Sequence, residues 1–179
     1  YDVSLPQCYQ PLWKKSDDPL YRNAIAYLKK RGIGGIDILR YSMGYCSSNG
    51  YANRIIIPSY DADGKLNYFI ARDMFPNSKL KYKNPPMSKD TVCFEMFINW
   101  NEPIVLVEGA FDAIAVRRNV IPLLGKFPSK TLVKRLVEKK VKKIYVALDE
   151  DAKKDAIKLS KFLMDYGIET YLLDMKDKD

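Results

Sequence analysis

The sequence predicts an α/β protein in which a mainly parallel sheet with helices on both faces is preceded by a smaller mixed α+β subdomain. From about residue 102 onward, short apolar strands alternate with amphipathic helices. This alternation indicates a parallel sheet, because parallel neighbours need crossover connections. Before it come a helix, a hairpin and a segment without apolar periodicity. We therefore expect two domains, residues 1–101 and residues 102–179.

Composition indicates a globular chain with a polyanionic partner. The 179 residues are 47% hydrophobic, which is enough to form a core. Lys and Arg number 30 against 22 acids, and a net charge of +8 favours nucleic acid. No apolar run approaches the roughly 20 residues of a membrane span, so we expect no membrane and a cytoplasmic location. The chain starts at Tyr1 rather than Met, and we expect a piece of a longer protein.

The sequence also excludes several kinds of chemistry. It has no histidine, which excludes His-based acid/base catalysis, Ser/His triads and the usual zinc ligand sets. Cys8, Cys46 and Cys93 form no CxxC pair, which argues against a disulfide framework and a zinc site in this fragment. Carboxylates remain as the strong ligands for a hard metal ion.

The N-terminal part predicts a helix and a hairpin. Residues 17–31 place apolar side chains at helical spacing after an Asp-Pro start, and Gly32 ends the run. A short helix is expected in GIDILRY and a strand in YSMGYC. The stretch NRIIIPSYDADGKLNYFIARD predicts two strands joined by an Asp-Gly turn. Residues 73–90, rich in Pro, Asn, Ser and Lys, are expected to form a basic loop.

The C-terminal part predicts four strands that alternate with three helices. The expected strands are IVLV, VIPLL, KIYVAL and IETYLL. The expected helices lie in GAFDAIAVRR, PSKTLVKRLVEKK and AKKDAIKLSKFLMDYG.

Acidic side chains follow two of these strands. Glu108 comes directly after IVLV, and Asp149 and Asp151 follow KIYVAL. Functional groups collect at the carboxyl ends of parallel strands, so we expect the three acids at one rim, where they would suit Mg²⁺. Each acid also precedes a predicted helix, and a capping role stays open. Asp112, one turn after Glu108, is a further ligand candidate or a solvated surface acid.

The stretch VLVEGAFDAIAV, followed by VALDEDA, resembles the Toprim domain shared by bacterial-type primases, topoisomerases and some nucleases. In that family a strand-terminal glutamate and a DxD pair bind Mg²⁺. The resemblance implies a Rossmann-like sheet with Glu108, Asp149 and Asp151 as catalytic metal ligands and Asp112 as the acid of the EGxxD extension. For Glu108, a role as proton acceptor stays open beside that of a ligand. Mn²⁺ would substitute for Mg²⁺.

The preceding segments AIAYLKKRGI, YSMGYC, NRIIIPSYDADGKLNYFIARD and LKYKNPP resemble, in that order, the region before Toprim in DnaG-type and phage primases. There, hairpin arginines and a KY-N segment line a basic path for template and nucleotides. The matching residues are Arg54, Arg72, Lys81, Tyr82, Lys83 and Asn84. The hairpin and lysine-rich loop look closer to the phage branch.

The resemblance implies a DNA primase, a nucleotidyltransferase that synthesises RNA primers from nucleoside triphosphates on single-stranded DNA. A replicative helicase is an expected partner, and a phage protein would work in the host cytoplasm. Tyr82 or Tyr68 could stack on bases, although an aromatic residue in a half-buried strand favours a core position for Tyr68.

The sequence departs from the family at several points. Glu150 stands between the two aspartates, and Lys126 lies in LLGKFPS, where it could contact a phosphate or be an ordinary surface lysine. The late acidic motif matches either Asp177 or Asp179. Three alternatives stay open: a Toprim nuclease or topoisomerase fragment, a receiver-like module, and a primase relic that only binds single-stranded DNA.

Overall fold

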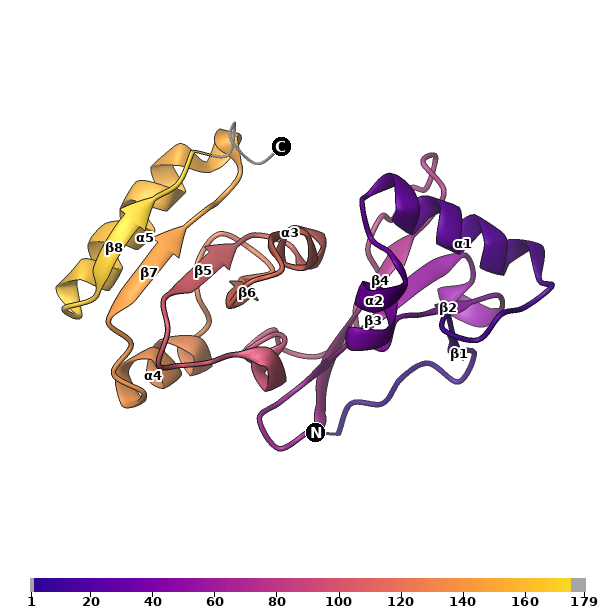
Figure 1. Cartoon of the computed structure of the whole chain (residues 1–179), viewed down its shortest axis with the longest axis horizontal. Coiled ribbons are helices and arrows are strands. Elements are labelled where there is room, and N and C mark those ends of the chain that lie inside the picture. Colours follow the sequence, from indigo (N-terminus) through magenta and orange to yellow (C-terminus); the bar gives the residue numbers. More distant parts are fainter. Residues whose placement is uncertain (1, 175–179) are drawn as a thin grey trace. The chain divides into compact units, whose positions relative to one another are not determined.

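A computed structural model describes residues 2–174, and the chain divides into two compact units (Figure 1). The first unit comprises residues 1–60 and 64–87, and the second comprises residues 61–63 and 88–179. Each unit contains a four-stranded sheet of its own. The assignment of separate roles to residues 1–101 and 102–179 stays a prediction.

The first sheet is antiparallel, in the order β1-β2-β3-β4. The predicted hairpin is formed by β3 (Arg54–Tyr60) and β4 (Leu66–Asp73), and β2 (Gly44–Cys46) pairs with β3. Gly64, with a φ of +82°, lies between the hairpin strands, in a conformation that glycine adopts without steric cost. The two-residue edge strand β1 (Gln10–Pro11) has no clear pattern in the sequence.

Both helices expected in the first unit are present. Helix α1 (Pro19–Lys30) begins where Asp18 Oδ1 accepts a hydrogen bond of 2.9 Å from the backbone N–H of Leu20. Helix α2 (Gly35–Arg40) follows after a short turn. Ala24 and Leu28 are fully buried on the inner face of α1, which is therefore held by packing as well as by its cap.

The second sheet is parallel throughout, in the order β6-β5-β7-β8, as its alternating pattern predicts. Its strands are β5 (Ile104–Val107), β6 (Val120–Pro122), β7 (Lys143–Val146) and β8 (Glu169–Leu172). Strand β5 pairs with both β6 and β7. The carboxyl ends of β5 and β7 are therefore neighbours, although the two strands are separated in sequence by β6 and two helices.

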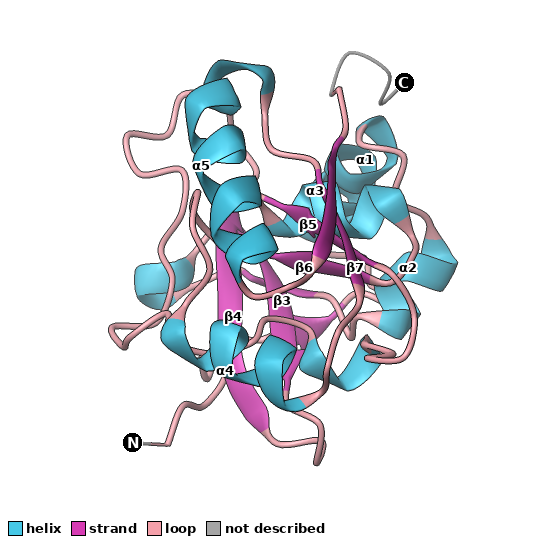
Figure 2. Cartoon of the chain, turned by 90° about the vertical axis from the view of Figure 1, so that its left-hand side faces the viewer, coloured by secondary structure: helices cyan, strands magenta, loops and turns pink. Residues whose placement is uncertain are grey.

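Helices cover both faces of the parallel sheet. Helices α4 (Lys130–Glu138) and α5 (Lys153–Asp165) lie together on one side of it (Figure 2). Their apolar side chains share a core with alternate strand residues, including Leu132, Leu136, Leu159, Leu163, Ile104, Leu106, Ile144 and Val146. Helix α3 (Ala110–Val116) connects β5 to β6, a step in the opposite direction across the sheet. Right-handed crossovers therefore place α3 on the other face.

Single 3-10 turns complete the described helical segments: Asn49–Tyr51, Glu95–Phe97 and Glu150–Ala152. Across the described residues, every helix is too short or too polar to cross a lipid bilayer.

Candidate metal centre and nucleic-acid contacts

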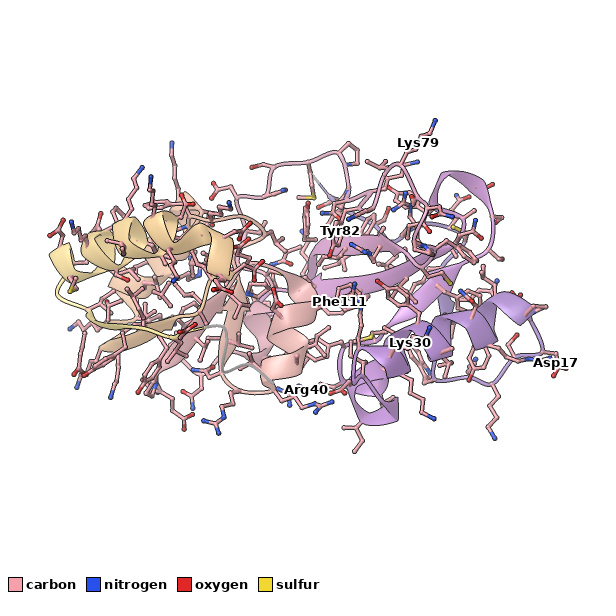
Figure 3. The ribbon with its side chains drawn as sticks, turned by 90° about the horizontal axis from the view of Figure 1, so that it is seen from above. Asp17, Lys30, Arg40, Lys79, Tyr82 and Phe111 are labelled. Carbon is pink, nitrogen blue, oxygen red and sulfur yellow. The ribbon has the colours of Figure 1, made fainter. Side chains whose placement is uncertain are left out.

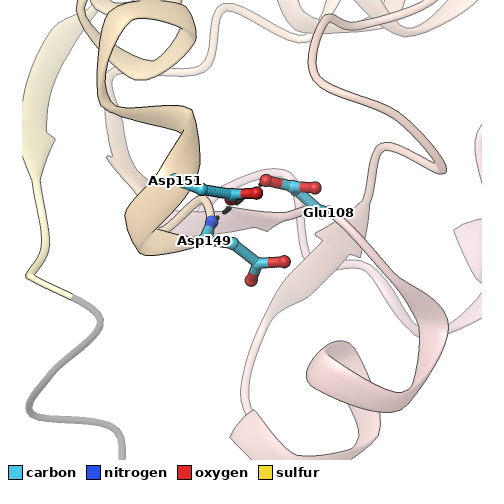
Figure 4. Close-up of side chains that lie close together, drawn as sticks. All are labelled: Glu108, Asp149 and Asp151. Carbon is cyan, nitrogen blue, oxygen red and sulfur yellow. Dashed lines mark hydrogen bonds between the residues drawn. The ribbon is translucent and has the colours of Figure 1, made fainter.

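Three acidic side chains meet at the carboxyl ends of β5 and β7. Glu108 directly follows β5, while Asp149 and Asp151 lie in the segment between β7 and α5. One carboxylate oxygen from each residue lies within 4.8 Å of the other two (Figure 4). We call these three residues the carboxylate triad. Glu108 is partly buried, whereas the two aspartates are exposed.

A hydrogen bond between the two strand ends holds the triad together. Glu108 Oε1 accepts the backbone N–H of Asp149 over 3.1 Å, drawn as the dashed line in Figure 4. Side-chain capping of a helix does not explain Glu108 or Asp149. Gly109, not Glu108, is the N-cap of α3, and the side chain of Asp149 makes no capping hydrogen bond to the 3-10 turn that follows it.

The pKa of the Glu108 carboxyl is raised above its usual value, chiefly because partial burial disfavours the charged form. The negative charges of Asp149 and Asp151 raise this pKa further. The Asp149 N–H bond and the positive charge of Lys126 oppose the rise. A cation would relieve this repulsion, and an all-oxygen donor set is the one that Mg²⁺ prefers. The residues present therefore fit a magnesium ion.

Two other predicted residues are Asp112 and Lys126. Asp112, in the first turn of α3, accepts the backbone N–H of Gly109 through Oδ2 over 3.3 Å, as a cap does. It is not one of the three gathered carboxylates, and its role as a metal ligand stays a prediction. The exposed Lys126 places Nζ 3.9 Å from Asp155 Oδ2 and is close enough to lower the pKa of Glu108.

In the first unit, Arg54 is a buried residue with a structural task. Its Nη1 donates to the carbonyl oxygens of Ala71 (3.2 Å) and Lys81 (3.1 Å), and its Nη2 donates to that of Leu80 (2.7 Å). The guanidinium thereby fastens the loop after β4 to the sheet. Its position at the start of an apolar strand gave the only hint of burial in the sequence, and a direct contact with nucleic acid stays a prediction.

Arg72 and Tyr82 form a cationic stacking pair. The guanidinium carbon of Arg72 lies 4.9 Å from the centre of the Tyr82 ring, and a β-bridge joins the two residues. Tyr82, labelled in Figure 3, is 42% exposed. The Nε of Arg72 is buried and has no hydrogen-bond partner within the part of the chain that the structure describes. The pair therefore offers a flat aromatic surface beside a cation.

Of the neighbouring predicted residues, two make hydrogen bonds to the backbone and one is exposed to solvent. Lys83 Nζ donates to the carbonyl of Gly50 over 2.8 Å and lies 4.8 Å from the centre of the Tyr51 ring. Asn84 Oδ1 accepts the backbone N–H of Ala71 over 3.2 Å. The side chain of Lys81 is exposed.

Two sequence predictions remain, the core position of Tyr68 and the late acidic motif. Tyr68 is 1% exposed, so the prediction of a core position is confirmed. Asp177 and Asp179 lie outside the described residues.

The fold of the chain is that of DnaG-type primase catalytic cores. A DNA primase domain from Pseudomonas aeruginosa superimposes with a TM-score of 0.72 and 22% identity, over 92% of this chain and 67% of that one. A DnaG primase catalytic domain bound to single-stranded DNA gives a TM-score of 0.72 and 18% identity, over 92% of this chain and 66% of that one. No protein-family model matches the chain.

Two bacterial proteins are similar to the chain in sequence. The uncharacterized protein MG010 of Mycoplasma genitalium is 31% identical over 182 residues, which cover 94% of this chain and 81% of that protein. The chain therefore belongs to the family of that protein. A DNA primase of Legionella pneumophila is 28% identical over 176 residues, covering 72% of this chain but only 30% of the primase.

Proposed function

We propose that this chain is the catalytic core of a Toprim DNA primase, which synthesises short RNA primers on single-stranded DNA by Mg²⁺-dependent nucleotidyl transfer. The observation that carries the proposal is the carboxylate triad, gathered within 4.8 Å at adjacent strand ends of a primase-type fold. An acid cluster alone is common on protein surfaces. Its position after the neighbouring strands β5 and β7 is where open parallel sheets bind ligands.

The triad is suited to transfer of a nucleotidyl group. Glu108, Asp149 and Asp151 would hold Mg²⁺, which neutralises phosphate charge and lowers the pKa of an attacking hydroxyl when bound. The hydrogen bond from Asp149 to Glu108 keeps the two strand ends in register. Lys126, beside these acids, is placed to attract a triphosphate. A carboxylate or water must accept the proton, because the chain contains no histidine.

The first unit supplies candidate contacts for template and nucleotide. The stacked pair of Arg72 and Tyr82 presents a cation and an exposed ring, which suit a phosphate and a base. Lys81 adds an exposed charge, while Arg54, Lys83 and Asn84 hold the loop that carries Tyr82. Single-stranded DNA is bound by one structural neighbour, and we assign the same template to this chain.

The remaining partners follow from the same assignment. Nucleoside triphosphates would be the substrates, a replicative helicase a partner, and the cytoplasm the location. A phage origin rests on the resemblance of the hairpin and loop alone, and both curated relatives described above come from bacteria.

The test is ribonucleotide incorporation on single-stranded DNA with Mg²⁺ or Mn²⁺, with a short annealed RNA primer to bypass initiation. Wild type should extend the primer according to the template sequence. Asp149→Asn should be inactive with an unchanged unfolding transition, because it removes one ligand of the triad. Glu150→Gln, which removes a neighbouring acid outside the triad, is the matched control and should stay active.

Two outcomes would overturn the proposal. Degradation of the nucleic acid by wild type, abolished by Asp149→Asn, would identify a Toprim nuclease that uses the same acids. Salt-dependent template binding without extension at high protein concentration would identify a binding relic.

A further inference from the structure

A second basic and aromatic surface lies on the second unit, along α5. It consists of Phe127, Phe162, Tyr166, Lys154, Lys158 and Lys161, and we call it the α5 surface. Phe127 and Phe162 pack edge to face with ring centres 4.9 Å apart. Phe162 and Tyr166 do the same at 5.1 Å. The three rings thus form a continuous row from the loop after β6 to the end of α5.

The outer rings of this row are open to solvent. Phe127 is 42% exposed and Tyr166 is 52% exposed, whereas Phe162 between them is partly buried. A hydrophobic contact that served only to fix the loop against α5 would need the pairing of Phe127 with Phe162. It would not need a further exposed ring at Tyr166. The row therefore offers more aromatic surface than local packing uses.

Positive charge accompanies the rings. Lys154, Lys158 and Lys161 are exposed and lie on one side of α5, because residues three and four apart share a helix face. Among the described residues none of the three forms an ion pair, and Lys158 Nζ lies 6.0 Å from the centre of the Phe127 ring. Of the two acids on α5, Asp155 is paired with Lys126 over 3.9 Å. Only Asp165 then stands against the three lysines. The surface therefore remains positive.

The α5 surface begins beside the carboxylate triad, because Asp151 lies two residues before the start of α5. Lys126 directly precedes Phe127 in the chain, and its charge lowers the pKa of Glu108. From Lys154 to Tyr166 the helix then extends about 18 Å away from that point. Phosphates attract lysines and bases stack on exposed rings, so the ligand chemistry that fits both features is a single-stranded nucleic acid.

We propose that the α5 surface binds single-stranded nucleic acid and guides it to or from the carboxylate triad. The binding contact stands on the rings and lysines themselves. That the bound nucleic acid leads to a catalytic site rests on the proposed function. Stacking and phosphate contacts of this kind are independent of sequence, so the surface should accept oligonucleotides of any base composition.

The test measures binding of a fluorescent 30-nucleotide oligo(dT) to the full chain in the presence of a chelator, at several salt concentrations. Lys158→Gln/Lys161→Gln should weaken binding about tenfold at low salt and reduce the salt slope by about 1.4, the value for two single-strand phosphate contacts. Lys139→Gln/Lys140→Gln removes the same charge from the exposed end of α4 and should change binding less than twofold. Tyr166→Leu, which keeps an apolar side chain, should weaken binding about fivefold.

A second measurement does not depend on variants. Ultraviolet crosslinking of wild type to the same oligonucleotide should label peptides that contain Phe127 or Tyr166. Equal losses in the α4 and α5 lysine variants, without such crosslinks, would overturn the proposal. Competition by polyglutamate as effective as competition by unlabelled oligo(dT) would assign the surface to an acidic protein instead.

Primer extension separates this proposal from the proposed function. If wild type extends primers while the α5 variants bind template normally, the α5 surface fails and the primase assignment stands. If wild type extends nothing while the α5 variants lose oligo(dT) binding, the primase assignment fails and the α5 surface stands.

Discussion

The two units use their charged side chains in opposite ways. In the first unit, positively charged side chains stabilise the fold through hydrogen bonds to the backbone. Arg54 donates to three carbonyls, and Lys83 donates to a fourth. In the second unit, Glu108, Asp149 and Asp151 gather their negative charges at a strand-end rim, which burial and repulsion make unfavourable for Glu108.

This difference separates structural charges from functional ones. A buried guanidinium whose N–H groups meet carbonyls stabilises the chain that surrounds it. A cluster of like charges costs stability and is retained where a ligand compensates it. Substitutions should therefore have contrasting effects: loss of stability in the first unit, and loss of cation binding in the second.

The largest effect is expected at the triad. Asp151→Asn should reduce Mn²⁺ affinity and primer extension by about 100-fold or more, because it removes a charged oxygen ligand. Its free energy of unfolding without metal should not fall. The Mn²⁺ affinity can be measured by electron paramagnetic resonance, with Glu150→Gln as the control of equal charge. Equal losses in both variants would show that general negative charge, not the triad, holds the ion.

Arg54→Leu should have the largest effect on stability. It removes the three hydrogen bonds that the guanidinium donates to the carbonyls of Ala71, Leu80 and Lys81, each of which keeps one other donor, and should lower the free energy of unfolding by about 2–4 kcal/mol. Urea denaturation measures the change. Lys81→Met, at an exposed side chain of the same loop, should stay within about 0.5 kcal/mol. If both variants are equally stable, the guanidinium does not have the structural task assigned to it.

Glu108→Gln should stabilise the metal-free protein slightly at neutral pH. The folded pKa of Glu108 lies above its unfolded value, so its favourable contribution is present below the unfolded pKa and is lost as pH rises through the folded pKa. Glutamine retains the acceptor for the Asp149 N–H without the charge. We expect a gain of a few tenths of a kcal/mol at pH 7, since solvent screens this partly exposed group, and a smaller gain at acid pH.

With Mg²⁺ present, wild type should be more stable than Glu108→Gln. The ion binds the ionised carboxylate, so wild type should gain stability from Mg²⁺ and lose that gain as pH falls through the raised pKa of Glu108. Thermal unfolding with and without Mg²⁺ at several pH values measures this. If Mg²⁺ stabilises Glu108→Gln as much as it stabilises wild type, Glu108 is not a ligand of the ion.

The smallest effect is expected at Lys126. Because its charge opposes the binding of a cation beside Glu108, Lys126→Gln should raise Mn²⁺ affinity by about twofold or less. The same change should raise the KM for nucleoside triphosphate by about threefold, since a phosphate contact is lost. Isothermal titration and steady-state kinetics give the two values. An unchanged or lower KM in Lys126→Gln would place Lys126 outside the triphosphate path.

The sequence predicts the second unit better than the first, for physical reasons. Alternating strands and helices dictate a parallel sheet, and the carboxyl-end rule then brings Glu108, Asp149 and Asp151 together without knowledge of any side-chain contact. The burial of Arg54 depends instead on carbonyls supplied by β4 and by the loop after it. No local pattern encodes that arrangement.

Asp112 illustrates the same limit within the second unit. It lies in the first turn of α3, one turn after Glu108, and its role at the metal site stays a prediction. Its hydrogen bond to Gly109, however, depends on how that helix begins. Strand β1 is likewise defined by its partner β2 rather than by its own two residues.

The most direct test of the central claim is Mn²⁺ binding by the full chain, followed by electron paramagnetic resonance in wild type, Asp149→Asn and Glu150→Gln. The carboxylate triad predicts that wild type and Glu150→Gln bind Mn²⁺ with the same affinity, that Mg²⁺ displaces it, and that Asp149→Asn loses this binding while remaining folded. Mn²⁺ binding that is unchanged in Asp149→Asn would contradict the claim that these three acids form the metal centre.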